Sequence, residues 1–405
     1  MSVFAQIGSQ CGSKITDGLN NGFIDGCILS PRDSKLDALK RRINELQEHR
    51  PDFEILFDPQ YYASTIAATE IKTKLGYLET EYTSFFSGAH YRELRRDSVV
   101  EKKIENCLDF QQQELNISKF ILPNICIVSD FDSASANVAL SFLEIGSDVA
   151  KAKNIHKQSY LTLAIDNTCI RQTERFLDFM DDLTSGRYSA KQFYILVQTS
   201  KYNESCPWNN SDALANQMYL AYVMAENGYK TLWGYSFLSA PFLWAAGADD
   251  CAFGWFNTLR YFSLNRYRDL GMSGRRANKR YFVTKFGVPV EWTLVANTMR
   301  SESEIKLQNR FDSDNIFFNA SGQEPTDSNE ISQYWDSLKR IDNAIKRKKN
   351  ITERIAFLKS YLDSINSTLA REEYSAFSTA EYRQTADGLA ALRKFTELAE
   401  IPFPK

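Results

Sequence analysis

Short apolar runs recur along this chain, each separated from the next by polar residues and a segment with helical periodicity. Most runs are continuously apolar rather than alternating, which is typical of parallel strands buried on both faces. The predicted strands span residues 3–8, 25–30, 54–58, 120–123, 161–166, 193–199, 231–235 and 250–255. Eight strands joined by helical crossovers predict an α/β fold of the (β/α)8 TIM-like barrel type. A doubly wound open sheet is the alternative, but no GxGxxG motif follows the first strand.

Two connections, at residues 59–100 and 257–300, are too long for ordinary loops between a strand and a helix. In a barrel both would leave the C-terminal ends of strands, which is the face where active sites are built. After residue 326, apolar residues recur at helical spacing in successive stretches. We therefore expect a barrel over residues 1–326 with long top-face insertions, and a C-terminal helical segment over 327–405 packed on it.

The composition excludes several classes of protein. The 48 Lys and Arg residues nearly balance the 51 Asp and Glu residues, for a net charge of -3, so no overall field attracts nucleic acid. The seven cysteines stand singly, as in reduced cytosolic proteins, and the three histidines lack metal-ligand spacing. No apolar stretch is long enough to span a membrane. We expect a cytoplasmic protein without a metal, a cofactor or a membrane partner, and neither a zinc hydrolase nor a Ser-His-Asp enzyme.

Two aspartates, Asp58 and Asp166, directly follow buried apolar strands. Their strands are two apart in a barrel, so the strand ends lie roughly 10 Å from each other. A carboxylate pair at such a separation suits cleavage of a glycosidic bond, with one as acid or base and the other stabilising a sugar cation. The structural alternative is that Asp58 caps the turn before Pro59 and Asp166 caps the helix beginning near Thr168. We predict that both aspartates are catalytic.

Other residues at the predicted strand ends are polar or aromatic. Amides of this kind read the edge of a base, and aromatic rings stack on a base or a sugar. The predicted substrate-binding residues are Gln6, Arg32, Gln60, Gln198, Trp233, Tyr235, Trp255 and Asn257.

A cationic segment follows the eighth predicted strand. Between Arg260 and Lys285 stand eight basic residues and one acid, Asp269, interleaved with tyrosine and phenylalanine. Clustered cations neutralise phosphates and aromatic faces stack on unpaired bases, so the segment predicts binding to nucleic acid. The alternative is a solvated helix face whose arginines pair with local acids. The predicted nucleic-acid-binding residues are Arg260, Arg266, Arg268, Arg275, Arg276, Lys279 and Arg280.

The stretch from Gly234 to Arg260 resembles the late-barrel pattern of tRNA-guanine transglycosylases. The resemblance is carried by Gly234 at the end of a strand, then Gly247-Ala-Asp249, the pair Asp250-Cys251, and Arg260. It implies a TIM barrel that acts at an N-glycosidic bond with aspartates, and it extends to DNA-acting relatives and to defence glycosylases that remove modified bases from phage DNA. In that family the nucleophilic aspartate lies further from the glycine than Asp250 does, and its zinc site has no counterpart after Cys251. We therefore do not assign that nucleophile to Asp250.

Together these patterns predict an enzyme that hydrolyses the N-glycosidic bond of a modified base in DNA, with a role in anti-phage defence. One of Asp58 and Asp166 would stabilise the sugar cation or activate water, and the other would act on the leaving base. Two alternatives stay open. A carbohydrate glycoside hydrolase would use the same carboxylates and leave the cationic segment without a role, whereas a non-catalytic nucleic-acid-binding protein would use that segment alone.

Overall fold

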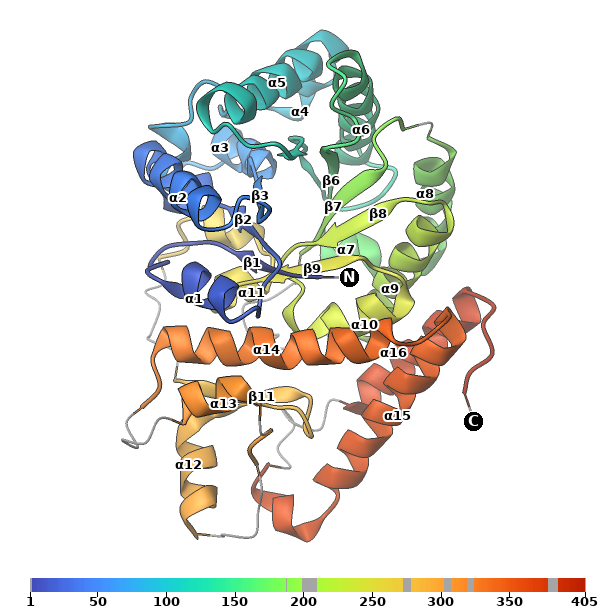
Figure 1. Cartoon of the computed structure of the whole chain (residues 1–405). Coiled ribbons are helices and arrows are strands. Elements are labelled where there is room, and N and C mark those ends of the chain that lie inside the picture. Colours follow the sequence, from blue (N-terminus) through green and yellow to red (C-terminus); the bar gives the residue numbers. More distant parts are fainter. Residues whose placement is uncertain are drawn as a thin grey trace.

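The chain folds into a barrel of parallel strands with helices around it (Figure 1). The computed structural model describes residues 2–186, 188–198, 210–271, 278–301, 307–309, 311–318, 324–377 and 385–404. The barrel strands are β1 (Ser2–Gln6), β2 (Gly26–Leu29), β3 (Glu54–Phe57), β4 (Phe120–Ile121), β5 (Cys126–Ile127), β6 (Ser159–Ile165), β7 (Gln192–Val197), β8 (Lys230–Trp233) and β9 (Asp250–Phe253). Their order is β3-β2-β1-β9-β8-β7-β6-β4, with β5 also paired to β6. The predicted (β/α)8 TIM-like barrel is confirmed.

Two short strands, β4 and β5, share one barrel position, because the strand is interrupted at Pro123 and Asn124. Pro123 has no N–H to donate to a ladder. The Asn124 side-chain amide instead donates to the carbonyl oxygen of Thr162 on β6 at 2.7 Å. No ladder of described residues joins β3 to β4, but the hydroxyl of Tyr160 donates to Glu54 on β3 at 3.0 Å. The barrel is therefore nearly closed.

Helices cover the outside of the barrel. They include α1 (Lys14–Asn20), α2 (Leu36–His49), α5 (Asp97–Asp109), α6 (Ala134–Ala152), α7 (Asn167–Ile170), α8 (Thr173–Ser185), α9 (Ser211–Glu226) and α10 (Ala240–Ala246). In α2, Leu39, Ile43 and Leu46 recur at helical spacing and are buried, whereas the opposite face is charged and exposed. The hydroxyl of Ser133 caps α6 by accepting from the N–H of Ala136. The sequence pattern thus fixes which face of each helix packs on the strands.

Helix α14 (Asp327–Lys346) completes this outer layer although it comes late in the chain. It runs beneath the barrel in Figure 1 and contacts α1, α10 and β1. The Trp335 indole N–H donates to the carbonyl oxygen of Phe253 at the end of β9, at 3.2 Å, and its ring lies against Gly18 on α1. Helix α14 thus takes the position of the last barrel helix. The boundary that we expected at residue 326, between the barrel and the C-terminal segment, therefore lies just before a helix that belongs to the outer layer of the barrel.

The remaining C-terminal helices, α15 (Ile351–Leu369) and α16 (Thr385–Leu398), pack against α10 and α9. Phe395 on α16 lies 6.1 Å from Tyr222 on α9, measured between ring centroids. Gly388 allows a close approach to Phe242 on α10. The expected C-terminal helices are confirmed. Within the described ranges, no helix combines the length and the apolar character that a membrane crossing needs.

Both long insertions begin at the C-terminal ends of strands. The first contains α3 (Ser64–Thr69) and α4 (Tyr91–Leu94). The second contains α11 (Asn257–Arg260) and the hairpin of β10 (Arg280–Val283) and β11 (Val288–Glu291). Helix α12 (Trp292–Ser301) forms its end, and α13 (Asp312–Phe317) follows it. Residues 261–271 of the second insertion run across the barrel mouth, and we call this segment the strap. Its isolated bridges are Ser236 to Tyr261, Gln198 to Phe262 and Thr73 to Arg268. These bridges join the ends of β8 and β7 to the first insertion.

Candidate active site at the barrel mouth

Asp58 directly follows β3 and has only 1% of its surface exposed. Its carboxylate accepts hydrogen bonds from the backbone N–H of Gln60 at 3.0 Å and from the hydroxyls of Tyr62 and Tyr194 at 2.8 and 3.2 Å. Burial raises the pKa of Asp58 to about 6, because the loss of hydration outweighs these hydrogen bonds and the nearby Arg266. Such a carboxyl exchanges its proton close to physiological pH, as general acids and bases do.

Gln6 and two tyrosines extend this network across the mouth. The hydroxyl of Tyr194, in β7, lies 3.2 Å from the carboxylate of Asp58 and 3.4 Å from Gln6 Oε1. Its single proton serves one of these two acceptors at a time. Gln6 Nε2 in turn donates to the hydroxyl of Tyr235 at 3.3 Å. The protonation state of Asp58 is therefore linked through Tyr194 to the orientation of the Gln6 amide.

The backbone is strained at several strand ends around the mouth. Non-glycine residues with positive φ include Gln10, Gln60, Ser129 and Tyr235, which follow β1, β3, β5 and β8. Each such residue costs about 1 to 3 kcal/mol. At Gln60 the left-handed turn lets the N–H reach Asp58 while the side-chain amide donates to Ser30 at 2.9 Å. Because strained residues gather at functional sites, their placement favours the mouth as the active site.

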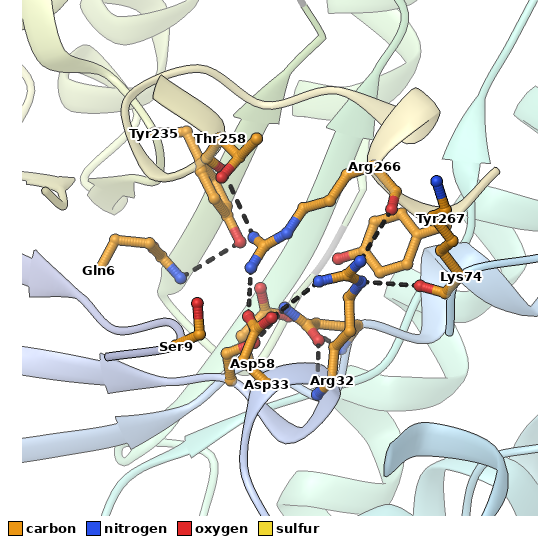
Figure 2. A network of polar contacts seen from close by, with 12 residues as sticks. Gln6, Ser9, Arg32, Asp33, Asp58, Lys74, Tyr235, Thr258, Arg266 and Tyr267 are labelled. Atoms are coloured by element: carbon orange, nitrogen blue, oxygen red, sulfur yellow. Dashed lines mark hydrogen bonds and ion pairs between the residues drawn. The ribbon is translucent and has the colours of Figure 1, made fainter. Parts of the chain in front are cut away.

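Two arginines and one carboxylate fasten the strap to the barrel (Figure 2). Arg266 of the strap forms a buried ion pair with Asp33 and donates to the carbonyl oxygen of Thr258 at 3.3 Å. Arg32 pairs with the same carboxylate at 2.7 Å and donates to the carbonyl oxygens of Arg266 and Lys74 at 3.1 and 2.9 Å. Although burial lowers the pKa of Arg266, the Asp33 carboxylate raises it above its ordinary value. We call these three side chains the Arg32–Asp33–Arg266 lock.

Asp166 follows β6 and caps α7. Its carboxylate accepts from the backbone N–H and the hydroxyl of Thr168 at 2.8 and 2.7 Å, and from the side-chain amide of Gln198. Asp166 thus caps α7, as the structural alternative to its predicted catalytic role describes. Asp58 and Asp166 follow strands at the same end of the barrel, but each has its own partners, and none of the contacts among the described residues joins them. Gln198 also accepts from the N–H of Leu264, so the strap reaches the surroundings of Asp166.

Three of the predicted substrate-binding residues lie outside these networks. Trp233 is buried, and its indole N–H donates to the hydroxyl of Thr231 at 3.3 Å. Trp255 donates to the carbonyl oxygen of Ser9 at 2.9 Å. Asn257 is exposed at the start of α11. The structure brings Gln6, Arg32, Gln60 and Tyr235 together around Asp58 and the lock, and it places Gln198 beside Asp166.

Several predicted nucleic-acid-binding residues are buried in ion pairs within the protein. Arg260 pairs with Glu330 on α14 at 2.9 Å and lies 4.6 Å from the centroid of the Tyr334 ring. Lys279 is buried against Asp327, at the start of the same helix. Arg266 is likewise buried in the lock described above. The acids come from distant parts of the chain, so these three cations do not form an open surface for phosphates.

The other predicted cations differ in their placement. Arg268 is partly exposed and pairs with Glu70 of the first insertion at 3.2 Å. Arg280 is also partly exposed, beside an acid of β11 at 3.8 Å. Arg275 and Arg276 lie outside the described residues. Of the predicted cations that the structure describes, Arg268 and Arg280 are thus the two that are partly exposed.

The tyrosines that surround Asp58 do not lie at strand ends, so the strand-end pattern does not predict them. Tyr62 lies in the first insertion, one short turn after Asp58, and its spacing of four residues was the available signal. Tyr267 lies on the strap and donates to the hydroxyl of Tyr62 at 3.4 Å. Tyr194 lies inside β7, where a tyrosine in an apolar run is typical of core packing.

No group of three or more His, Cys, Asp or Glu side chains in the described ranges is arranged to hold a metal ion. No protein-family model matches the chain, and no curated protein shows significant sequence similarity to it.

Proposed function

We propose that the protein hydrolyses the N-glycosidic bond of a base in DNA, with Asp58 as the general acid. The observation that carries this proposal is a buried carboxyl at the C-terminal end of a barrel strand, with its pKa raised by burial to about 6. Enzymes of this fold build their active sites at that end. A raised carboxyl pKa is characteristic of the acid that protonates a leaving group in glycosidic cleavage.

In the proposed reaction the bond between the sugar carbon C1′ and the base nitrogen breaks, and its electron pair stays with the base, which takes the proton of Asp58. Water adds to the sugar cation and loses a proton, which leaves an abasic sugar. The hydroxyls of Tyr62 and Tyr194 donate to the carboxylate that forms and stabilise it. Gln6, next to Tyr194, offers an amide that reads the edge of an extruded base.

The strap has to move before a substrate reaches Asp58, because that side chain is almost completely buried. The segment that closes the mouth is held by the Arg32–Asp33–Arg266 lock and by Tyr267, which contacts Tyr62. Closure of this kind excludes bulk solvent, apart from the water that reacts, and completes the site once the base is bound.

We extend the proposal to a modified base and to defence against phages that carry such bases. The rings of Tyr62, Phe262 and Tyr267 gather beside Asp58, with centroids 4.9 Å apart for Tyr62 and Phe262 and 5.8 Å apart for Tyr62 and Tyr267. Aromatic faces stack on bases and on sugar substituents, so these surroundings suit a substituted base.

A carbohydrate glycoside hydrolase is the second candidate, and the burial of Arg260, Arg266 and Lys279 in ion pairs favours it. Cations that are already paired release few counterions from DNA. Binding to single- and double-stranded DNA across a salt series distinguishes the two functions. DNA recognition gives a steep fall in affinity with salt, whereas a carbohydrate enzyme shows weak binding at every salt concentration.

Mass spectrometry of small products released from modified and unmodified phage DNA tests the proposed reaction. Wild-type protein should release a free base and leave sites that alkali cleaves. Asp58→Asn should slow release by about 100-fold or more, because proton transfer contributes that much to such reactions. Asp166→Asn is the matched comparison, because asparagine preserves the helix cap at that position. Release at the wild-type rate in Asp58→Asn would show that Asp58 is not the general acid, and release that survives both substitutions would show that neither carboxylate is catalytic.

A further inference from the structure

Two large apolar side chains stand exposed where the two insertions meet. Ile71 is 99% exposed and Leu270 is 48% exposed, and they are the exposed large hydrophobic residues of the described part of the chain. Single exposed apolar residues are common on protein surfaces, but two that flank one bridge between the insertions indicate a contact surface.

The two residues belong to a short antiparallel pairing between the first insertion and the strap. Thr73 is bridged to Arg268, and a backbone hydrogen bond on each side of the bridge fixes the register. Counting two residues outward from the bridge places Ile71 opposite Leu270. Residues opposite each other in this way project to the same side of the pairing. We call this pair of side chains the apolar tip.

Cations outnumber acids around the apolar tip. Lys72, Lys74 and Arg268 flank it, together with Glu70 and Asp269. Lys74 pairs with Asp269 at 2.8 Å and Arg268 with Glu70 at 3.2 Å, and all four side chains are more than one-third exposed. Exposed ion pairs of this kind are weak, so a phosphate can replace either acid. The surroundings of the tip therefore complement a polyanion.

A short path joins the apolar tip to Asp58. Leu270 is three residues from Tyr267, whose hydroxyl donates to Tyr62, and Tyr62 donates to Asp58. Three residues of extended chain span at most about 11 Å. The tip therefore lies within a few residues of the tyrosines that surround Asp58.

We propose that the apolar tip is a wedge that enters the base stack of duplex DNA beside the nucleotide on which Asp58 acts. This inference rests on the proposed function and extends it to double-stranded DNA. Apolar side chains inserted between base steps unstack them and kink the duplex. Unstacking lowers the free energy needed to turn a base out of the helix and into a buried site. The flanking lysines and Arg268 would hold the adjacent phosphates.

A duplex that carries 2-aminopurine next to a mismatch tests the wedge, because this base fluoresces more strongly when it is unstacked. The test variant is the double substitution Ile71→Ser and Leu270→Ser, which changes exposed side chains only. The matched control is Lys72→Gln, which changes a flanking cation and keeps the tip. Asp58→Asn, which keeps the tip, reports unstacking without chemistry.

We expect wild type and Asp58→Asn to raise the fluorescence several-fold at saturation. The double variant should bind about tenfold more weakly and give no increase, since burial of two aliphatic side chains is lost. Lys72→Gln should keep the increase but reduce the slope of affinity against salt by about one phosphate contact. An increase that persists in the double variant, or a protein that binds no duplex, would overturn the wedge. So would a double variant that only changes the oligomeric state.

Failure of the wedge and failure of the proposed function give different results. If bases are released while the fluorescence increase does not depend on the tip, the wedge is wrong and the glycosylase reaction stands. If the increase depends on the tip but no DNA yields a free base, the tip enters DNA and the proposed chemistry is wrong.

Discussion

The proposed chemistry depends on a single buried carboxyl. Asp58 exchanges its hydration for hydrogen bonds from Gln60, Tyr62 and Tyr194, and these donors replace it only in part. Its pKa accordingly rises from 3.8 to about 6. A carboxyl whose pKa is raised by folding stabilises the folded state when it is protonated, and this contribution disappears when it ionises.

Asp58→Asn should therefore remove a pH dependence from the stability of the protein. The contribution of Asp58 is fully present below pH 3.8 and is lost as the pH rises through about 6. This shift in pKa corresponds to about 3 kcal/mol. Relative to wild type, the variant should gain up to that amount in free energy of unfolding between pH 4 and pH 8, measured in urea. A difference that stays constant over this pH range would show that Asp58 titrates as an ordinary exposed carboxyl.

Some residues of the site could be predicted from the sequence and others could not. Asp58 is predictable because a polar residue that ends a buried run has to lie at the strand end. Tyr194 is not, because a hydroxyl inside an apolar strand gives no sign of the carboxylate that it meets across the barrel. The burial of Arg260 depends on Glu330, which lies 70 residues later in the chain.

The strap is the element that controls access to Asp58, and the Arg32–Asp33–Arg266 lock sets its stability. Asp33 is shared by two guanidinium groups that are mostly buried. Removing Arg266 leaves Asp33 paired with Arg32, whereas neutralising Asp33 leaves two cations facing each other. A buried charge that loses its partner is far more destabilising than a broken exposed pair.

Asp33→Asn should consequently loosen the strap more than Arg266→Met does. We expect Asp33→Asn to lower the free energy of opening by about 3 to 5 kcal/mol. Hydrogen exchange of the backbone amides of residues 261–271 measures this opening. Arg268→Met, which breaks the exposed pair with Glu70, is the control and should change the free energy by about 1 kcal/mol or less. Equal protection in all three variants would show that the lock does not hold the strap.

For the whole molecule, the repeating strands were predictable, but the placement of α14 was not. Each buried apolar run followed by a helical segment predicts its own unit of the barrel, so the fold could be inferred from local patterns. Helix α14 has the same periodicity as the helices after it. Only contacts far apart in the chain, such as that between Gly18 and Trp335, place it in the barrel layer.

Trp335→Ala should destabilise the entire barrel and not only the C-terminal helices. Trp335 is fully buried between α1 and the end of β9, so its truncation leaves a large cavity. We expect a loss of about 3 to 5 kcal/mol in the free energy of unfolding. Phe357→Ala, at a half-buried position on α15, is the control and should cost less. If Trp335→Ala unfolded α14 to α16 in a separate transition and left the barrel intact, α14 would belong to an independent unit.

The pH dependence of base release under single-turnover conditions tests the role of Asp58 most directly. If its protonated form is the acid, the rate constant should be level below pH of about 6 and fall about tenfold for each further pH unit. Asp58→Asn should release the base slowly and without that fall. A wild-type rate that rises through pH 6, or the same fall in Asp58→Asn, would contradict the assignment.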